Sequence, residues 1–269
     1  MRKLIACFNL LWLTAFMGAA PQRIVSINLC SDESLLALAD PPRVAGVTRY
    51  PKSPGTEKLL AEHPEIRRVS GRLEEVLALH PDLVIAGIFS PRASVEALRR
   101  LNIPVYLEGV PESFDSIRAQ ILKLAGAVGE PQRGQTLVQE LDEGLARLPA
   151  ASLPSKTVVF FGPAGHVTGS ETFEDAVIRA AGGRNAAAEH GLKGHAWISL
   201  ETLLAWNPQV LVYSEGEQTQ DSIGRQILHH PALHRGLPQT RFVKLDPGLT
   251  ECGSQATPRA VLQIAEALA

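Results

Sequence analysis

The stretch LEEVLALHPDLVI at residues 73–85 decides the fold of this chain, because it recurs as LETLLAWNPQVLV at residues 200–212. The two stretches align without a gap, and Leu, Glu, Ala and Pro recur at matching places. In both, a helical pattern ends at a proline and leads into a short apolar run that is typical of a buried parallel strand. A helix followed by a buried strand is common in α/β proteins, but the run of identities favours two similar α/β lobes.

Outward from this repeat, short β-rich runs alternate with helical patterns on both sides. The predicted strands are residues 23–27, 44–47, 83–86, 104–107, 157–161, 210–213 and 242–245. Strands that alternate with helices predict βαβ units and parallel sheets. Ser31 is suited to cap the first helix, whose first turn would carry Asp32 and Glu33. We therefore expect an α/β protein of two Rossmann-like lobes, each with a central parallel sheet, and a ligand cleft between them.

The boundaries of the lobes follow from a region without strands. Helical patterns run from residue 113 to residue 148 with no convincing strand between them. We assign residues 21–128 to an N-terminal α/β lobe and residues 151–269 to a C-terminal α/β lobe. Residues 129–150 then form the single long helix that joins the two lobes.

The first 20 residues have the three parts of a secretory signal peptide. Arg2 and Lys3 supply the positive start, residues 4–16 form an apolar run, and residues 18–20 are small. The apolar run is shorter than the roughly 20 residues that a membrane-spanning helix needs. We expect cleavage near Ala20 and a mature protein in the periplasm, with an uncleaved membrane anchor as the alternative.

Composition and motifs exclude several classes of function. The 269 residues are 45% hydrophobic and 20% charged, with a formal net charge of −2. This is an ordinary globular composition, without the basic excess that nucleic-acid binding favours. The sequence contains no nucleophile elbow, no glycine-rich phosphate loop, no His-Glu-x-x-His and no Cys-x-x-Cys. We expect that the chain is not an enzyme, holds no cofactor or metal of its own, and binds no nucleic acid.

The loops after the predicted strands contain candidate ligand-binding residues. Ligands of open parallel sheets bind beyond the carboxyl ends of the strands, and an interface between lobes is a favoured position for a pocket. The candidates are Tyr50, Phe89, His166, His195, Trp197 and Glu251. Their apolar and ring-shaped side chains suit a large, partly apolar solute better than an amino acid or a bare metal ion. Each residue also has a simpler interpretation as a packing residue of its own lobe or as a solvated loop residue.

Two cysteines remain after the predicted signal peptide is removed. Cys30 follows the first strand and Cys252 precedes the last helix, so both loops are expected to face the cleft. In an oxidising compartment two such thiols can form a disulfide. The alternative is a pair of free thiols that contact the ligand.

Taken together, these features resemble the periplasmic binding proteins of ABC importers for cobalamin, ferric siderophores and haem, whose two lobes are bridged by one long helix. The resemblance covers the mature chain, and its most specific pieces are residues 23–27, 73–85, 181–185, 199–201 and 258–259. It implies that Glu74 and Glu201, which occupy the same place in the repeat, dock on arginines of a permease dimer in the membrane. Alternatively, each is a first-turn carboxylate that the helix macrodipole favours.

Cobalamin binders are the nearest comparison, so the resemblance implies a protein that captures cobalamin or a related corrinoid and delivers it to the permease. We expect it to be a monomer. The chain departs from the cobalamin binders because Trp197 is the only tryptophan expected near the cleft, and His195 stands close to the place of their C-lobe tryptophan.

Other ligands and functions stay open at this point. A ferric siderophore would be met by Arg49 and Arg92, and haem by Tyr50 or His166 as an axial ligand. A cleft hydrolase would use His166 or His195 as a base, but it lacks a nucleophile with a partner. A surface-interaction domain without a small ligand is the remaining alternative.

Overall fold

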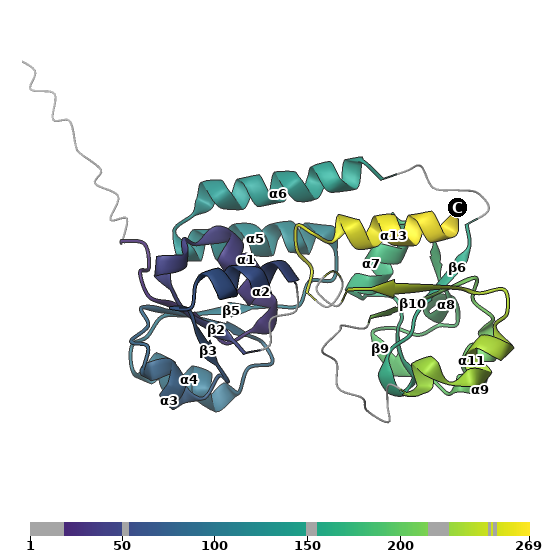
Figure 1. The fold of residues 1–269 in the computed structure, drawn as a ribbon, viewed down its shortest axis with the longest axis horizontal. Helices are drawn as coiled ribbons and strands as arrows, with labels where there is room; N and C mark the ends of the chain where they lie inside the picture. Colours follow the sequence, from purple (N-terminus) through teal and green to yellow (C-terminus); the bar gives the residue numbers. More distant parts are fainter. Residues whose placement is uncertain (1–18, 50–53, 149–154, 215–225, 247–248, 250–251) are drawn as a thin grey trace, which may run out of the picture.

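The computed structural model describes residues 19–49, 54–148, 155–214, 226–246, 249 and 252–269. These residues form two α/β lobes that lie side by side, each around a parallel sheet (Figure 1). The predicted α/β class with two lobes is therefore confirmed. Among the described helices, none combines the length and the apolar character that a membrane crossing requires.

The N-terminal lobe is built on a five-stranded parallel sheet in the order β3-β2-β1-β4-β5. Its elements are β1 (Ile24–Ser26), α1 (Leu29–Leu38), η1 (Pro41–Arg43), β2 (Val44–Thr48), α2 (Pro54–Glu62), β3 (Arg67–Val69), α3 (Leu73–Leu77), β4 (Leu83–Gly87), α4 (Arg92–Arg100) and β5 (Val105–Glu108). Two longer helices follow, α5 (Phe114–Val128) and α6 (Pro131–Ala146). All five residues of β4 are buried, as its continuous apolar sequence predicts.

The C-terminal lobe has a four-stranded parallel sheet in the order β11-β10-β6-β8. Its elements are β6 (Thr157–Phe160), η2 (Pro163–Gly165), β7 (His166–Thr168), α7 (Phe173–Ala180), β8 (Arg184–Asn185), α8 (Ala186–Glu189), β9 (His195–Trp197), α9 (Leu200–Trp206), β10 (Val210–Ser214), η3 (Ile227–His229), α11 (Pro231–Gly236), β11 (Arg241–Leu245) and α13 (Pro258–Leu268). Strands β7 and β9 pair separately in an antiparallel ribbon.

The two copies of the sequence repeat form equivalent structures. One copy gives α3 and β4, and the other gives α9 and β10. Val76 and Leu203, at matching places, are the fully buried residues of the two helices. His80 and Asn207, also at matching places, both adopt left-handed backbone, with φ of 46° and 44°. The repeat therefore extends to the backbone conformation that turns each helix into its strand.

The residue after the proline of each copy holds the neighbouring strand in the same way. The backbone N–H of Asp82 donates to the carbonyl of Arg23 at 3.0 Å, and that of Gln209 donates to the carbonyl of Thr157 at 3.1 Å. In return, Asp82 Oδ1 accepts from the N–H of Arg23 and Gln209 Oε1 accepts from the N–H of Thr157, both at 2.9 Å. A side-chain oxygen at this position thus fixes the register of the central strands in both lobes.

Helix α6 lies over α5 and α13 and reaches from one lobe toward the other (Figure 1). The largest apolar core cluster includes Ile85 of the N-terminal sheet, Leu141 of α6, Val212 of the C-terminal sheet and Ile264 of α13, all fully buried. Gly144 allows the close approach of α6 to α13, because a Cβ atom there would lie 2.7 Å from Pro258. This arrangement supports the proposal that α6 joins the lobes, with boundaries near residues 129–150.

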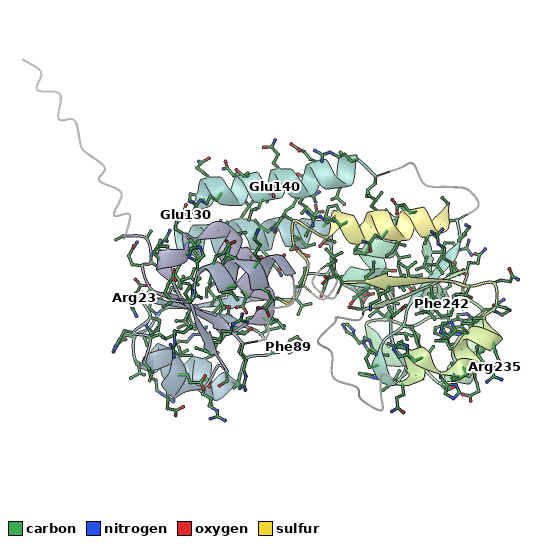
Figure 2. All side chains as sticks on the ribbon, in the orientation of Figure 1. Arg23, Phe89, Glu130, Glu140, Arg235 and Phe242 are labelled. Carbon is green, nitrogen blue, oxygen red and sulfur yellow. A yellow bond between two sulfur atoms is a disulfide. The ribbon has the colours of Figure 1, made fainter. Side chains whose placement is uncertain are left out.

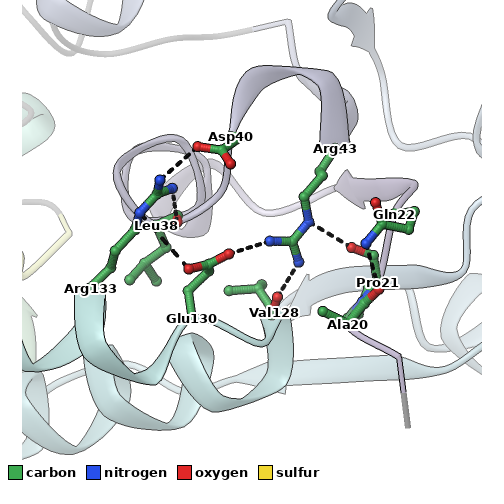
Figure 3. Close-up of polar contacts among 9 residues, drawn as sticks. All are labelled: Ala20, Pro21, Gln22, Leu38, Asp40, Arg43, Val128, Glu130 and Arg133. Atoms are coloured by element: carbon green, nitrogen blue, oxygen red, sulfur yellow. Dashed lines mark hydrogen bonds and ion pairs between the residues drawn. The ribbon is translucent and has the colours of Figure 1, made fainter.

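A polar network fixes the start of α6 to the N-terminal lobe (Figure 3). Arg43 forms an ion pair with Glu130, which immediately precedes α6, and its Nε donates to the carbonyl of Pro21 at 2.8 Å. Arg133 in the first turn of α6 pairs with Asp40 at 2.7 Å. The carbonyl of Pro21, next to the predicted cleavage site, is therefore held by a partly buried arginine.

The sequence prediction was wrong at the start of the first helix. Helix α1 begins at Leu29, and its N-cap residue Asn28 makes no capping hydrogen bond through its side chain. Ser31 lies inside the helix, fully buried, and its hydroxyl donates to Glu108 instead of capping. The buried carboxylate of Glu108, at the end of β5, accepts the hydrogen bond of this hydroxyl in place of a backbone group of the helix. Glu108 is distant in the sequence, so the local pattern could not predict this contact.

Candidate functional site

The β7–β9 ribbon follows the carboxyl end of β6 and lies on the side of the C-terminal lobe that faces the N-terminal lobe (Figure 1). Its register pairs His166 with Trp197 and Thr168 with His195. Gly165, immediately before β7, has φ of +82°, and a Cβ atom there would lie 2.1 Å from the carbonyl oxygen of Ile198. A glycine at this position therefore allows the segment after β9 to close against the start of β7.

His166 and His195 form a hydrogen-bonded pair of imidazole rings. Nε2 of His166 lies 3.1 Å from Nδ1 of His195, the ring centroids are 5.2 Å apart, and the ring planes differ by 18°. The two ring centroids are farther apart than the two facing nitrogens by about one ring width. The rings therefore meet end to end, through an N–H···N hydrogen bond, rather than face to face. Burial, and secondarily the charge of His195, lower the pKa of His166 and favour its neutral form.

Trp197 completes an aromatic face on the ribbon. Its ring meets His166 edge to face at a centroid distance of 5.3 Å. His195 and Trp197 are two residues apart on one strand, so both side chains point to the same face, and both are exposed. Ala196 between them packs against the core of the lobe. In β9, two polar or aromatic residues flank the small apolar Ala196, and this alternation is the sequence signal that could have predicted the strand.

Phe89 is the corresponding exposed aromatic residue of the N-terminal lobe. It follows the carboxyl end of β4 and lies at the edge of its lobe that faces the C-terminal lobe (Figure 2). Phe89 and Trp197 are 85% and 67% exposed, the largest values among the exposed large apolar side chains of the described residues. Contiguous exposed apolar surface marks interaction sites, and Phe89 forms such surface together with its neighbour Ile88, which is 51% exposed.

The structure brings together some of the predicted ligand-binding residues. His166, His195 and Trp197 form one contiguous face. Tyr50 and Glu251 lie outside the described residues.

Glu74 and Glu201 lie away from this face, in the first turns of α3 and α9, and both are exposed. Helices α3 and α9 lie on the same side of the molecule, at the bottom of the view (Figure 1). The pKa of Glu201 is lowered by hydrogen bonds from its own backbone N–H and from Ser199.

Cys30 and Cys252 form a disulfide with a Cα–Cα distance of 4.9 Å. It joins the first turn of α1, just after β1, to the segment that leads into α13. The carboxyl side of the N-terminal sheet is thereby linked to the C-terminal part of the chain.

A buried polar cluster under the carboxyl ends of β1, β2 and β5 was not predicted from the sequence. Oδ2 of Asp32 accepts from the backbone N–H and the hydroxyl of Thr48, at 3.0 and 2.5 Å, whereas Oδ1 has no hydrogen-bond partner among the described residues. Glu108 accepts from Ser31 and from Asn28. Burial raises the pKa of Asp32 to about 7, and the charge of Glu108 contributes in the same direction. Burial also raises the pKa of Glu108.

The described residues contain no group of three or more His, Cys, Asp or Glu that could hold a metal ion. What the exposed face offers is two imidazoles, an indole and, on the other lobe, a phenyl ring. Such a surface is chemically suited to a flat or ring-shaped ligand, through apolar contact and stacking and with imidazole nitrogen as its polar group.

Residues 24–236 match the periplasmic binding protein family. An ABC transporter substrate-binding lipoprotein from Bacillus subtilis is 26% identical over 212 residues, which are 73% of this chain and 64% of that protein. A cobalamin-binding protein from Halobacterium salinarum is 26% identical over 207 residues, 73% of this chain and 54% of that protein. The chain thus spans only 54–64% of the length of these relatives.

A solved structure, the periplasmic heme-binding protein of Roseiflexus sp. RS-1 in its apo form, superimposes with a TM-score of 0.74. Its sequence is 26% identical, and the match covers 92% of this chain and 97% of that one.

Proposed function

Since the chain belongs to the periplasmic binding protein family, whose members are solute-binding proteins rather than enzymes, we propose that it is the solute-binding subunit of an ABC importer. Its ligand in this proposal is cobalamin or a related corrinoid, held between the lobes and delivered to the permease. The protein works as a monomer in the periplasm after a signal peptide has been removed near Ala20.

The observation that carries this proposal is the exposure of Phe89, at the edge of the N-terminal lobe that faces the C-terminal lobe (Figure 2), and of Trp197 at the end of β9. Covering a large aromatic side chain buries about 150–250 Å² of surface. The favourable transfer free energy is about 25 cal/mol for each Å² of apolar surface buried. A ring ligand that contacts both residues gains this burial from both lobes at once. A free amino acid or a sugar is too small or too polar to do so.

Delivery to the permease rests on the two repeat glutamates. Glu74 and Glu201 are exposed, pseudo-symmetric and on one side of the molecule. A permease of two like subunits presents two equivalent surfaces, and arginines on them would pair with the two carboxylates. Such pairs set the register and the rate of encounter more than the affinity.

A second candidate ligand is haem, or less directly a ferric siderophore. The observation that favours haem is the exposed His166–His195 pair, because imidazole is a common axial ligand of haem iron. The similarity to the heme-binding protein of Roseiflexus adds to this support.

The absorption spectrum of the protein purified from its native cells tests the proposal. Bound corrinoid would give its own visible bands, and these bands should disappear when the protein is unfolded and dialysed. The Soret band of haem in their place would replace the first candidate by the second. Stoichiometric amounts of an amino acid or a sugar, identified by mass spectrometry, would contradict both.

A further inference from the structure

A second pair of matching segments follows the repeat, one in each lobe. ALRR at residues 97–100 lies at the end of α4, and ALHR at residues 232–235 lies near the end of α11. Leu98 and Leu233, at matching places in these segments, are both fully buried. Each helix leads into the edge strand that pairs with the strand of its repeat copy, β5 beside β4 and β11 beside β10. The pseudo-symmetry of the lobes therefore extends to the arginine that closes each segment.

The basic side chains of these two segments are exposed and keep their charge. Arg99, Arg100 and Arg235 are all exposed, and none of them forms an ion pair with the described residues. The Nε of Arg235 donates to the carbonyl of Pro231 at 3.3 Å, which satisfies a donor but does not neutralise the charge. Directly after the two arginines of α4, Leu101 is 54% exposed. The end of α4 is thus both basic and apolar.

The arginines stand farther from the other lobe than the two glutamates of the repeat. Helices α3, α4, α9 and α11 each precede a parallel strand, so each runs from the carboxyl edge of its sheet toward the amino edge. Glu74 and Glu201 lie in the first turns of α3 and α9. Arg100 and Arg235 lie in the last turns of α4 and α11. Figure 2 shows Arg235 at the outer end of the C-terminal lobe, away from the N-terminal lobe.

The acidic and the basic residues belong to one side of the molecule. Helix α4 packs beside α3, and α11 packs beside α9. All four helices lie at the bottom of the view, on the side opposite α6 (Figure 1). When Glu74 and Glu201 contact a permease, this side faces the membrane. The outer ends of the lobes then lie over the bilayer that surrounds the permease.

Phosphate groups at the surface of a bilayer fit the chemistry of this side. Guanidinium groups bind phosphate through paired hydrogen bonds. An apolar side chain among basic residues, as Leu101 is, suits the boundary between headgroups and acyl chains. The whole chain has a formal net charge of −2, so its net charge opposes binding to an anionic surface. Attraction to such a surface therefore has to come from these local arginines.

We propose that Arg99, Arg100 and Arg235, together with Leu101, bind the anionic phospholipid headgroups around the permease. This inference rests on the proposed function and adds membrane lipid as a second partner of the docked protein. Each arginine near an anionic bilayer strengthens binding about fivefold. Three arginines give a weak attraction by themselves, and it becomes useful when the permease already holds the two glutamates.

Vesicles without permease test the lipid contact by itself. The purified protein is mixed at low salt with vesicles of equal parts phosphatidylglycerol and phosphatidylcholine, or of phosphatidylcholine alone, and the bound fraction is measured by cosedimentation. We expect binding to the anionic vesicles only, and its loss at high salt, which screens surface charges. Arg100→Gln/Arg235→Gln should weaken this binding on the order of 25-fold, a factor of about five for each arginine. Leu101→Ser should weaken it without changing its salt dependence.

The matched control removes the same charge from the other side of the molecule. Lys123 lies on α5 and Arg147 directly follows α6, and both are exposed. Lys123→Gln/Arg147→Gln protein should bind the anionic vesicles as the wild type does. Equal weakening by the two double variants would overturn the inference, because net charge alone would then explain it. Wild-type binding by Arg100→Gln/Arg235→Gln would overturn it too, and would leave these arginines as helix-end charges that the macrodipole favours.

Nanodiscs that contain the permease separate this inference from the proposed function. The wild type should dock more tightly in discs with phosphatidylglycerol than in discs of phosphatidylcholine alone, and Arg100→Gln/Arg235→Gln should lose this difference. Equal weakening of the variant in both discs would assign the arginines to acidic groups of the permease. That result overturns the lipid contact, yet it leaves the proposed function intact. Binding to anionic vesicles without any docking in either disc would instead overturn the proposed delivery to the permease.

Discussion

Cys30 and Cys252, which are 222 residues apart in the sequence, are joined by a disulfide with their Cα atoms 4.9 Å apart. The loop-entropy model assigns a cross-link over so long a loop roughly 5 kcal/mol of stabilisation, because it restricts the unfolded chain. We therefore expect Cys30→Ser/Cys252→Ser protein to unfold at a lower denaturant concentration than the oxidised protein, and at about the same concentration as the reduced wild type. Two alkylatable thiols in native, unreduced protein would contradict the pairing.

Asp32 should make stability depend on pH. Its pKa is raised from 3.8 to about 7 by burial, so the folded protein binds this proton more tightly than the unfolded chain. Its contribution to the free energy of unfolding is present below pH 3.8 and is lost as the pH rises through about 7. The raised pKa of Glu108 acts in the same direction. Asp32→Asn should flatten the fall between pH 4 and pH 7, and should raise stability above pH 7 by on the order of a few kcal/mol. Parallel pH profiles for both proteins would show that Asp32 is not responsible.

Gly165 should tolerate no side chain. A Cβ atom would lie 2.1 Å from the carbonyl oxygen of Ile198, and the backbone φ of +82° is strained for any other residue. Gly165→Ala should destabilise the protein by about 1–3 kcal/mol and weaken ligand binding, because the β7–β9 ribbon shifts.

The matched control is Gly126→Ala in α5, where a Cβ atom would meet nothing within 4 Å. This change should stabilise the helix by about 0.5–1 kcal/mol. Both variants are compared by denaturant unfolding and by ligand titration. Equal stability of the two would refute the close contact at Gly165.

The pseudo-symmetric glutamates should matter for transport but not for ligand capture. First-turn carboxylates stabilise a helix by only about 0.3–1 kcal/mol, so Glu74→Arg/Glu201→Arg protein should stay folded and bind ligand normally. Transport by a reconstituted importer should fall, more for the double variant than for either single one. Glu140→Arg is the control, because Glu140 lies on the outer side of α6, away from α3 and α9 (Figure 2). Wild-type transport by the double variant would show that the two carboxylates are only helix-end charges.

Much of the architecture could be predicted from the repeat, because its helix, its proline turn and its buried strand are local patterns. The repeat also includes His80 and Asn207, the two matching residues whose backbone is left-handed. The β7–β9 ribbon was missed because each strand has only three residues, and its pairing depends on distant segments meeting at Gly165. The hydrogen bond of the His166–His195 pair is a consequence of that pairing, so the sequence indicated both residues but not their contact.

The buried Asp32 cluster was missed for a different reason. Asp32 has the sequence context of a helix-start carboxylate, and only the tertiary approach of β2 and β5 turns it into a buried group beside Glu108. Local propensity cannot show that approach. Tyr50 and Glu251 lie outside the described residues, so their predicted contacts with the ligand stay predictions.

Calorimetric titration of the purified, ligand-free protein with a panel of solutes tests the central claim most directly. The panel contains cobalamin, cobinamide, haem, a ferric siderophore, a free amino acid and a sugar. We predict one-site binding of a ring-shaped metal ligand, weakened by Phe89→Ala and by Trp197→Ala because each removes an aromatic surface that the ligand covers. Tight binding of the amino acid or the sugar, with no binding of the metal-containing ligands, would contradict the account.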